Sequence, residues 1–475
     1  MTKKILALIL SLVLSLGILS SVISFGSLAA TEKKIGDFDT DGVITVSDAL
    51  GVLRIVAKIN PLVEEDVEVY DLSGDGAVAI DDALCLLRCA VGLADGNLGY
   101  AGVEISFSAN QELLDFGITQ ELFEEALVSQ GNTARLAKVM ERAAKGETIN
   151  MTVIGGSITA GSSASSLDNC YGSRVFDWWK ANFPQAKFNV SNMGIGATTS
   201  ILGVHRLESD VLRRNPDFII VEFAVNDDEK MGEYYESLIR RLLLEDQDMA
   251  VIMLFMTAEG RWNRQEQEIP IGNHYQIPMV SYHNPIWRLM DDGSIIWDDI
   301  SPDDIHPNDV GHGVAAALIT SYLDGVKEKS DKLSKVVPAI PSPLYSDRYM
   351  DATLYGGKTL DVDSLGAWKV DTSLSSYHIN TGWTLEKRGK AMEFTAEFKE
   401  LNLHYLKVVN PEKNYGSIKI SIDDEVVYVL SSKFPGGWGD FFSSETVYKS
   451  DEAKEHKVTL AYNGGKFSIL GIMLS

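Results

Sequence analysis

The sequence predicts an α/β domain at the centre of the chain, built as a three-layer, doubly wound parallel sheet. Three observations point to this organisation: apolar strand-like runs alternate with helical stretches from residue 149 to residue 323, a duplicated acidic pattern precedes them, and short alternating runs follow them. We therefore expect a small all-α module before the α/β domain and a β-sandwich domain after it. A chain of 475 residues is long enough for three such parts.

The first 30 residues have the three parts of a secretory signal peptide. Lys3 and Lys4 precede the apolar run 5–19, and the small residues 27–30 follow it. An uncleaved membrane anchor is the alternative. No later segment is apolar enough to span a bilayer, so we expect an extracellular protein without membrane insertion. The formal net charge of −25 disfavours nucleic acids and anionic membranes as partners.

Residues 37–48 have the spacing of a calcium-binding loop, with oxygen ligands at positions 1, 3, 5 and 12 and a turn-forming Gly42 at position 6. The same pattern returns 34 residues later, and an amphipathic helix follows each loop. Two loops in register favour structural calcium binding over chance acidic turns. The expected metal ligands are Asp37, Asp39, Asp41, Val43 and Asp48 in the first loop and Asp71, Ser73, Asp75, Ala77 and Asp82 in the second.

Each acidic unit is a loop followed by a helix, because the signal peptide leaves no room for a helix before the first loop. This half-motif duplication, over residues 33–95, resembles the dockerin module. The resemblance implies a cohesin module of a scaffold protein as partner, as in a cellulosome. It also implies that loop positions 10 and 11 face that partner, namely Val46 and Ser47, and then Ile80 and Asp81. A purely structural calcium module is the alternative.

The α/β domain is expected to span residues 101–330. Between strands at 149–154, 188–192, 218–223, 250–255 and 277–281 we expect helices at 173–183, 201–214, 233–244 and 284–290, with a final helix at 309–323.

Four separated motifs supply the polar residues of one candidate active site in this domain. Ser157, Gly196 and Asn226 each follow a predicted strand, and the carboxyl ends of parallel strands meet at one edge of a sheet. Asp303 and His306 stand three residues apart in a later loop. A serine nucleophile, two further oxyanion donors and an acid–histidine pair together predict an esterase-type hydrolase.

Each of these residue types fits a step of acyl transfer. His306 would take the Ser157 proton and later return it to the leaving group, while Asp303 would set the ring tautomer. The oxyanion would be held by the N–H groups of Ser157 and Gly196 and by the side-chain amide of Asn226. This chemistry needs no metal. Asp304 and Asp299 are less favoured as the acid. We expect Glu222 to be a buried, paired carboxylate rather than a catalytic group, and Asp227 and Asp228 to be loop residues.

Over residues 105–328 these motifs resemble those of the SGNH hydrolases, the GDSL family. Ser157, Gly196, Asn226 and His306 match its four named residues, and Asp303 matches the acid of its Asp-x-x-His block. Where the family name implies Gly-Asp-Ser-Leu, this chain has Gly-Ser-Ile-Thr at 156–159, a form that resembles secreted carbohydrate esterases of the superfamily.

Together with the dockerin, this resemblance implies a secreted, cellulosome-docked esterase. It would remove O-acetyl groups from plant cell-wall polysaccharide of the xylan or mannan type. A lipase, thioesterase or aryl esterase on the same site is one alternative. A non-catalytic carbohydrate-binding scaffold component is another, although the intact set of site residues argues against it.

Composition changes near residue 330. A Pro-rich stretch within residues 331–345 predicts an extended linker, and six short alternating runs predict the β-sandwich of residues 346–475. Candidate sugar-stacking or cleft-lining residues are Trp368, Trp383 and Trp438 in this domain, and Trp262, Asn263, Arg264 and Tyr275 in a long polar loop of the α/β domain. Core tryptophans and a solvated loop are the respective alternatives.

Overall fold

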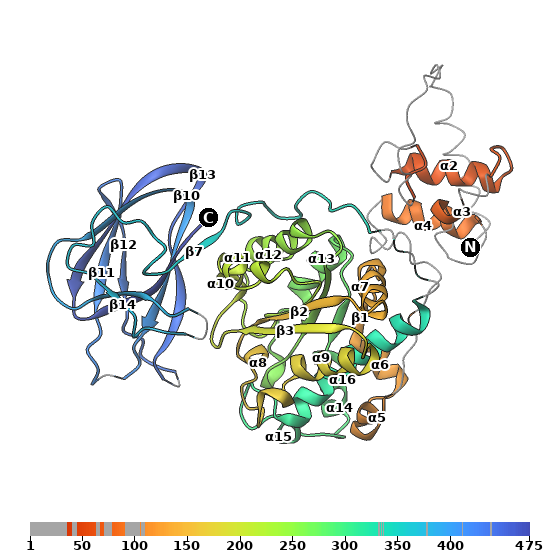
Figure 1. Cartoon of the computed structure of the whole chain (residues 1–475), viewed down its shortest axis with the longest axis horizontal. Coiled ribbons are helices and arrows are strands. Elements are labelled where there is room, and N and C mark those ends of the chain that lie inside the picture. The colour runs from red at the N-terminus through yellow and green to blue at the C-terminus, as the bar shows by residue number, and fades with distance from the viewer. Residues whose placement is uncertain are drawn as a thin grey trace, which may run out of the picture.

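The computed structural model (Figure 1) describes residues 36–39, 45–62, 67–70, 78–90, 105, 110–330, 333, 335, 337–376, 379–410, 412–437 and 439–475. The predicted signal peptide lies outside the described residues, and so do Asp41, Val43, Asp71, Ser73, Asp75, Ala77 and Trp438. The side chain of Asp81 is likewise outside. In the described part of the chain, no helix is both long and apolar enough to cross a membrane.

The N-terminal module consists of α2 (Val46–Val56), α3 (Val67–Tyr70) and α4 (Ile80–Ala90), so a helix follows each acidic loop as predicted. Asp48 and Asp82 hold equivalent places at the starts of α2 and α4. Each carboxylate accepts the N–H three residues before it, at 2.7 Å from Thr45 and 2.6 Å from Ala79. The two helices pack around a small core of Ala49, Val52, Ile55, Tyr70, Ala83 and Leu86.

The central sheet has six strands in the order β1-β6-β5-β4-β2-β3. Its predicted strands pair in parallel and are β2 (Thr148–Gly155), β3 (Lys187–Gly194), β4 (Phe218–Glu222), β5 (Ala250–Phe255) and β6 (Met279–Ser281). The short edge strand β1 (Leu127–Ser129) is antiparallel and was not predicted. The strand order reverses at β2, between β3 and β4, which is where doubly wound sheets bind their ligands.

Helices cover both faces of this sheet (Figure 1). One face carries α5 (Gln111–Phe116), α6 (Gln120–Ala126), α7 (Ala134–Ala144), α9 (Tyr171–Asn182), α14 (His283–Asp291) and α16 (Asp309–Lys329). The other carries α10 (Ser200–His205), α11 (Leu207–Asp210), α12 (Gly232–Glu245) and α13 (Gln265–His274). The expectation of a long polar loop from Trp262 to Tyr275 was wrong, because α13 occupies most of this segment and contains Pro270.

The C-terminal domain is all-β and antiparallel, as predicted. Its strands are β7 (Thr353–Tyr355), β8 (Lys369–Asp371), β9 (Gly382–Leu385), β10 (Met392–Lys407), β11 (Ser417–Ile422), β12 (Glu425–Ser431), β13 (Phe441–Gly464) and β14 (Phe467–Leu474). They form one continuous sheet that curves around a single apolar core (Figure 1). The domain is therefore a half-barrel, in which one curved sheet supplies both of the faces expected of a sandwich. Two predicted runs merge in β10, which bends at a bulge near Glu400.

The predicted linker is bound to the α/β domain. The buried carboxylate of Glu236, in α12, accepts the backbone N–H groups of Leu344, of Tyr345 at 2.7 Å and of Ser346 at 3.2 Å. A separate apolar cluster joins the C-terminal domain to the α/β domain. It consists of Ile195, Leu202, Ile379, Leu470 and Met473. The C-terminal domain is therefore packed against the domain that carries the candidate site.

Candidate active site

His306 joins Asp303 to Ser157. The ring Nδ1 lies 2.9 Å from Asp303 Oδ2, and the ring Nε2 lies 2.9 Å from Ser157 Oγ. With the proton on Nδ1, the ring donates to the carboxylate and accepts the serine O–H. This is the tautomer in which His306 can act as general base toward Ser157.

The loop after α15 (Trp297–Ile300) holds Asp303 in place. Asp303 Oδ1 accepts the backbone N–H groups of Ile305 and His306, at 2.8 and 2.7 Å. Partial burial acts to raise the pKa of Asp303, but the hydrogen bonds from His306 and Ile305 outweigh it and keep this pKa below its ordinary value. Asp303 is therefore a carboxylate at neutral pH and can accept the proton of the His306 Nδ1.

Asp299 and Asp304, the two alternatives to Asp303, have other contacts. The Asp299 carboxylate accepts the backbone N–H of Ile296 at 2.9 Å, at the start of α15. The Asp304 carbonyl accepts the backbone N–H of Glu259 at 2.7 Å. The ring of His306 is bonded to Asp303, as the spacing predicts.

Ser157 is the first residue of α8 (Ser157–Ala160), the short helix that begins just after β2. Its position next to Asn226 depends on the glycine before it. A β-carbon on Gly156 would lie 2.1 Å from Asn226 Oδ1, so the Asn226 amide packs directly against the backbone that leads to the serine. In this chain, a side chain at position 156 would displace that amide.

Gly196 lies in the turn that follows β3. The turn is tied to β2 by a hydrogen bond of 3.0 Å from the Ile195 N–H to the Gly155 carbonyl. The next residue, Ala197, has a φ of 59°, in the left-handed region that residues with a side chain rarely adopt. Backbone strain of this kind is concentrated at functional sites.

Asp227 connects the turn of Gly196 to the loop of Asn226. Its Oδ1 accepts the backbone N–H of Ser200 at 2.7 Å, and its Oδ2 accepts the Ser200 hydroxyl at 2.5 Å. Asp227 and Asp228 both lie in the loop after β4, as expected, but Asp227 is buried there whereas Asp228 is exposed. The Oδ1 atom of Asn226 itself is buried without a hydrogen-bond partner in the described part of the chain.

Comparison with known proteins agrees with this arrangement. The model of the GDSL-like lipase/acylhydrolase family matches residues 153–314, and the dockerin type I model matches residues 35–88. Two crystal structures of a two-domain esterase active on acetylated mannans are similar to 74% of this chain. The one co-crystallised with mannopentaose has 33% sequence identity, a TM-score of 0.69 and 97% of its length covered. The other has 34% identity, a TM-score of 0.70 and 98% covered.

The chain belongs to the GDSL-like lipase/acylhydrolase family. It is a carboxylic ester hydrolase that carries a dockerin type I domain. Among proteins with curated descriptions, none matches it in sequence. The family resemblance read from Ser157, Gly196, Asn226 and the Asp-x-x-His block is confirmed.

In this GDSL-like hydrolase a buried acidic cluster lies beneath the serine. Thr159, in α8, donates to Glu222 Oε2 at 3.0 Å and lies 2.8 Å from the Tyr171 hydroxyl. Burial raises the pKa of Glu222 to about 8 and that of Asp227 to about 7, and it also raises the pKa of Glu268 well above its ordinary value. Glu222 is thus a buried, bonded carboxyl group that is neutral at pH 7.

The candidate sugar-binding residues divide by exposure. Trp368, Trp383 and Tyr275 are buried at 3%, 1% and 2% exposure, and the Tyr275 hydroxyl donates to Glu236 at 2.7 Å. These three rings are core residues and are unavailable to a soluble ligand. Trp262, by contrast, is 50% exposed.

In the dockerin domain, three predicted ligands of the first loop come together. One carboxylate oxygen each from Asp37, Asp39 and Asp48 lies within 4.8 Å of the others. Asp37 and Asp48 are buried, at 2% and 0% exposure. Converging carboxylates with little access to water suit a hard cation that takes oxygen ligands.

Proposed function

We propose that the protein removes O-acetyl groups from plant cell-wall polysaccharide of the mannan or xylan type. The observation that carries the proposal is the chain of hydrogen bonds from Ser157 Oγ through His306 to Asp303. Two further points support the substrate class: the matched two-domain esterase acts on acetylated mannans, and the dockerin domain is of the kind that mounts enzymes on cellulosomes.

In the proposed reaction, Ser157 Oγ attacks the acetyl carbonyl while His306 Nε2 takes its proton. The carbonyl oxygen becomes an oxyanion, held by the N–H groups of Ser157 and Gly196 and by the amide of Asn226. The protonated ring returns its proton to the sugar oxygen, which leaves as the free hydroxyl. Water, deprotonated by His306, then attacks the acetyl-serine, and the ring returns this proton to Ser157 Oγ as acetate leaves. Asp303 stabilises the charged ring in both steps.

We also propose that the dockerin domain binds calcium. Asp37, Asp39 and Asp48 would supply carboxylate oxygens to the first ion, and Asp82 would serve the second loop at the position equivalent to Asp48. Calcium would neutralise acidic groups that the loop brings together. We expect EDTA to lower the unfolding temperature of the dockerin domain. Asp39→Asn should weaken calcium binding, measured by titration calorimetry, and leave esterase activity unchanged.

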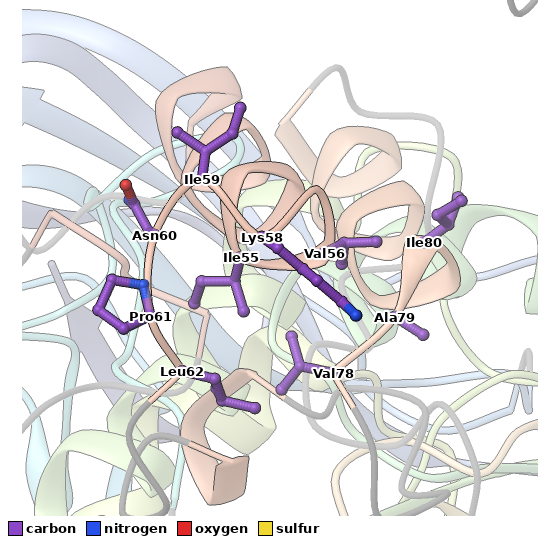
Figure 2. Close-up of a pocket in the computed structure, with 10 residues that line it drawn as sticks. All are labelled: Ile55, Val56, Lys58, Ile59, Asn60, Pro61, Leu62, Val78, Ala79 and Ile80. Carbon is purple, nitrogen blue, oxygen red and sulfur yellow. The ribbon is translucent and has the colours of Figure 1, made fainter.

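A cohesin module is the partner that we propose for this domain. The position-10 residues Val46 and Ile80 are 53% and 61% exposed, although both are apolar. Ile80 also borders a largely apolar hollow with Ile55, Ile59, Leu62 and Val78 (Figure 2). Exposed apolar side chains on a small domain are typical of a protein-binding surface. Binding to a cohesin would anchor the enzyme to an extracellular scaffold protein.

The test of the proposed function is acetate release from acetylated mannan, acetylated xylan and acetylated pectin, with Ser157→Ala as the matched control. We expect release by the wild type from mannan or xylan and none above background by the variant. Cleavage of long acyl or aryl esters without acetate release would instead support a lipase or aryl esterase on the same site. Equal activity of Ser157→Ala would overturn the assignment of the nucleophile.

A further inference from the structure

The segment 258–264 follows β5 and bonds to both flanks of the candidate site. On one flank, the backbone N–H of Glu259 donates to the carbonyl of Asp304, the residue after Asp303, at 2.7 Å. On the other flank, the indole Nε1 of Trp262 donates to the Val225 carbonyl at 2.9 Å. Val225 directly precedes Asn226, so the indole is anchored one residue from a proposed oxyanion donor.

Arg264 supports the Trp262 ring from one side. Its guanidinium carbon lies 4.4 Å from the centroid of the ring, in cation–π geometry. Its Nε donates to the carbonyl of Asp227, the residue after Asn226, at 3.1 Å, and its side chain is only 11% exposed. One face of the indole is therefore covered by a nearly buried, hydrogen-bonded arginine.

The rest of the indole faces solvent. Trp262 is 50% exposed, and it is the one tryptophan of the described residues with so open a side chain. Its single polar atom is already bonded to Val225, so the exposed surface is apolar. The preceding residues, Gly260 and Arg261, have φ values of 71° and 70°, a left-handed turn that is unfavourable for Arg261.

A structural role alone does not account for these features. A core tryptophan would be buried, as Trp368 and Trp383 are, and a solvated loop would not need a strained turn and an arginine support to hold an indole beside Asn226. A flat aromatic face with slightly negative charge suits the C–H groups of a pyranose ring. Binding sites for small molecules combine such aromatic surfaces with a few polar groups.

We propose that the open face of Trp262 is a sugar-stacking platform beside the active site. This proposal rests on the proposed function and deepens it: Trp262 would hold a sugar ring of the acetylated chain while Ser157 acts on the acetyl group. The segment 258–264 would then take part in substrate recognition. A small ester without a sugar would not contact the Trp262 platform.

The kinetic test compares Trp262→Ala with the wild type on two substrates, an acetylated manno-oligosaccharide and 4-nitrophenyl acetate. We expect KM for the oligosaccharide to rise on the order of 10-fold, which corresponds to about 1.4 kcal/mol of binding free energy, because the stacking contact is lost. Activity on 4-nitrophenyl acetate should stay within about twofold. Trp262→Phe, which keeps a ring but loses the Nε1 donor, should lie much closer to the wild type on the oligosaccharide.

Tyr345→Ala is the matched control, because Tyr345 is an equally exposed aromatic residue, at 50%, on the bound linker. It should change neither substrate. An equal loss on both substrates in Trp262→Ala would mean that the indole only positions the Asn226 loop, and it would overturn the platform. No loss on either substrate would overturn it as well.

A binding experiment separates this proposal from the proposed function. Ser157→Ala and the double variant with Trp262→Ala are titrated with the same oligosaccharide by calorimetry. Binding that needs Trp262, without acetate release by the wild type, would sink the proposed function but keep the platform. Acetate release by the wild type, with binding that does not depend on Trp262, would support the proposed function and overturn the platform. Neither binding nor release would overturn both.

Discussion

The described part of the molecule contains two Asp–His pairs with similar hydrogen-bond geometry. They differ in the contact that the second ring nitrogen of the histidine makes. In the α/β domain, His306 Nδ1 lies 2.9 Å from Asp303 Oδ2; in the C-terminal sheet, His456 Nδ1 lies 2.7 Å from Asp423 Oδ2. His306 Nε2 reaches Ser157 Oγ, whereas His456 Nε2 is buried with no hydrogen-bond partner in the described part of the chain.

The surroundings explain why only one pair can take part in chemistry. The His456 side chain is 7% exposed and lies beside the rings of Phe398 and Tyr448, at centroid distances of 5.0 and 5.2 Å. The His306 side chain is 26% exposed and lies at the edge of the sheet where the strand order reverses. An acid–histidine pair by itself can be a purely structural contact, as the pair of His456 is. A serine within reach of the second ring nitrogen makes the pair of His306 a candidate catalytic unit.

The largest expected difference is between Asp303→Asn and Asp423→Asn. Asp303→Asn should lower kcat on the order of 10³- to 10⁴-fold, because an amide in this place favours the wrong ring tautomer. Asp423→Asn should leave kcat within about twofold and lower the thermal midpoint instead. Acetate release and thermal unfolding measured on both variants check this, and similar kcat losses in the two would break the comparison.

Gly156→Ala should have the next largest effect. Its β-carbon would lie 2.1 Å from Asn226 Oδ1, so the proposed oxyanion donor must move. Losing one such donor lowers kcat on the order of 10²- to 10³-fold. Gly439→Ala, at a glycine with open space around it, is the control and should be neutral. Wild-type kcat in Gly156→Ala would exclude Asn226 from the oxyanion site.

Asp227→Ala should have an intermediate effect. It removes both hydrogen bonds from Ser200 and so frees the turn of Gly196 from the loop of Asn226. We expect kcat to fall about 10-fold with little change in KM, because loosened donors act in the transition state. Ser200→Ala, which removes only the hydroxyl bond, should lose less. If KM rises while kcat is constant, Asp227 serves binding rather than the oxyanion site.

The last expected effect concerns stability and pH and leaves the catalytic groups unchanged. Burial raises the pKa of Glu222 from its ordinary value of 4.5 to about 8, so the folded protein keeps a proton that the unfolded chain has released. Unfolding free energy should therefore fall as pH rises between these values, by up to about 1.4 kcal/mol per pH unit. Glu222→Gln lacks this loss, so its melting temperature relative to the wild type should increase from pH 5 to pH 8.

Exposed Glu266→Gln is the control for that series and should show a constant difference from the wild type. A constant difference for Glu222→Gln as well would show that Glu222 is ionised in the folded protein at pH 5.

The sequence predicted what depends on local pattern. The bounds of β5 agree with the strand predicted at 250–255, and the Asp-x-x-His spacing placed Asp303 on the ring of His306. Strand ends in a parallel sheet meet at one edge, so the approach of the Ser157 turn to Asn226 could also be expected.

The sequence could not predict contacts that exist only once the layers are packed. Asp227 was expected to be a loop residue only, because its partner, Ser200, begins α10, 27 residues earlier in the sequence. Glu236 is one of several acidic residues on a helix, and only the folded linker reveals its role as acceptor for Tyr345 and Ser346. The exposure of Trp262 depends on Arg264 and on a left-handed turn, and neither leaves a periodic signal.

The most direct test of the central claim is to label the nucleophile. The wild type, Ser157→Ala, Asp303→Asn and Asp423→Asn are treated with a fluorophosphonate, and the modified peptide is identified by mass spectrometry. The account predicts one phosphonyl group on Ser157 in the wild type, rapid and equal labelling in Asp423→Asn, slow labelling in Asp303→Asn and none in Ser157→Ala. Labelling of another serine, or equal rates in Asp303→Asn and the wild type, would contradict it.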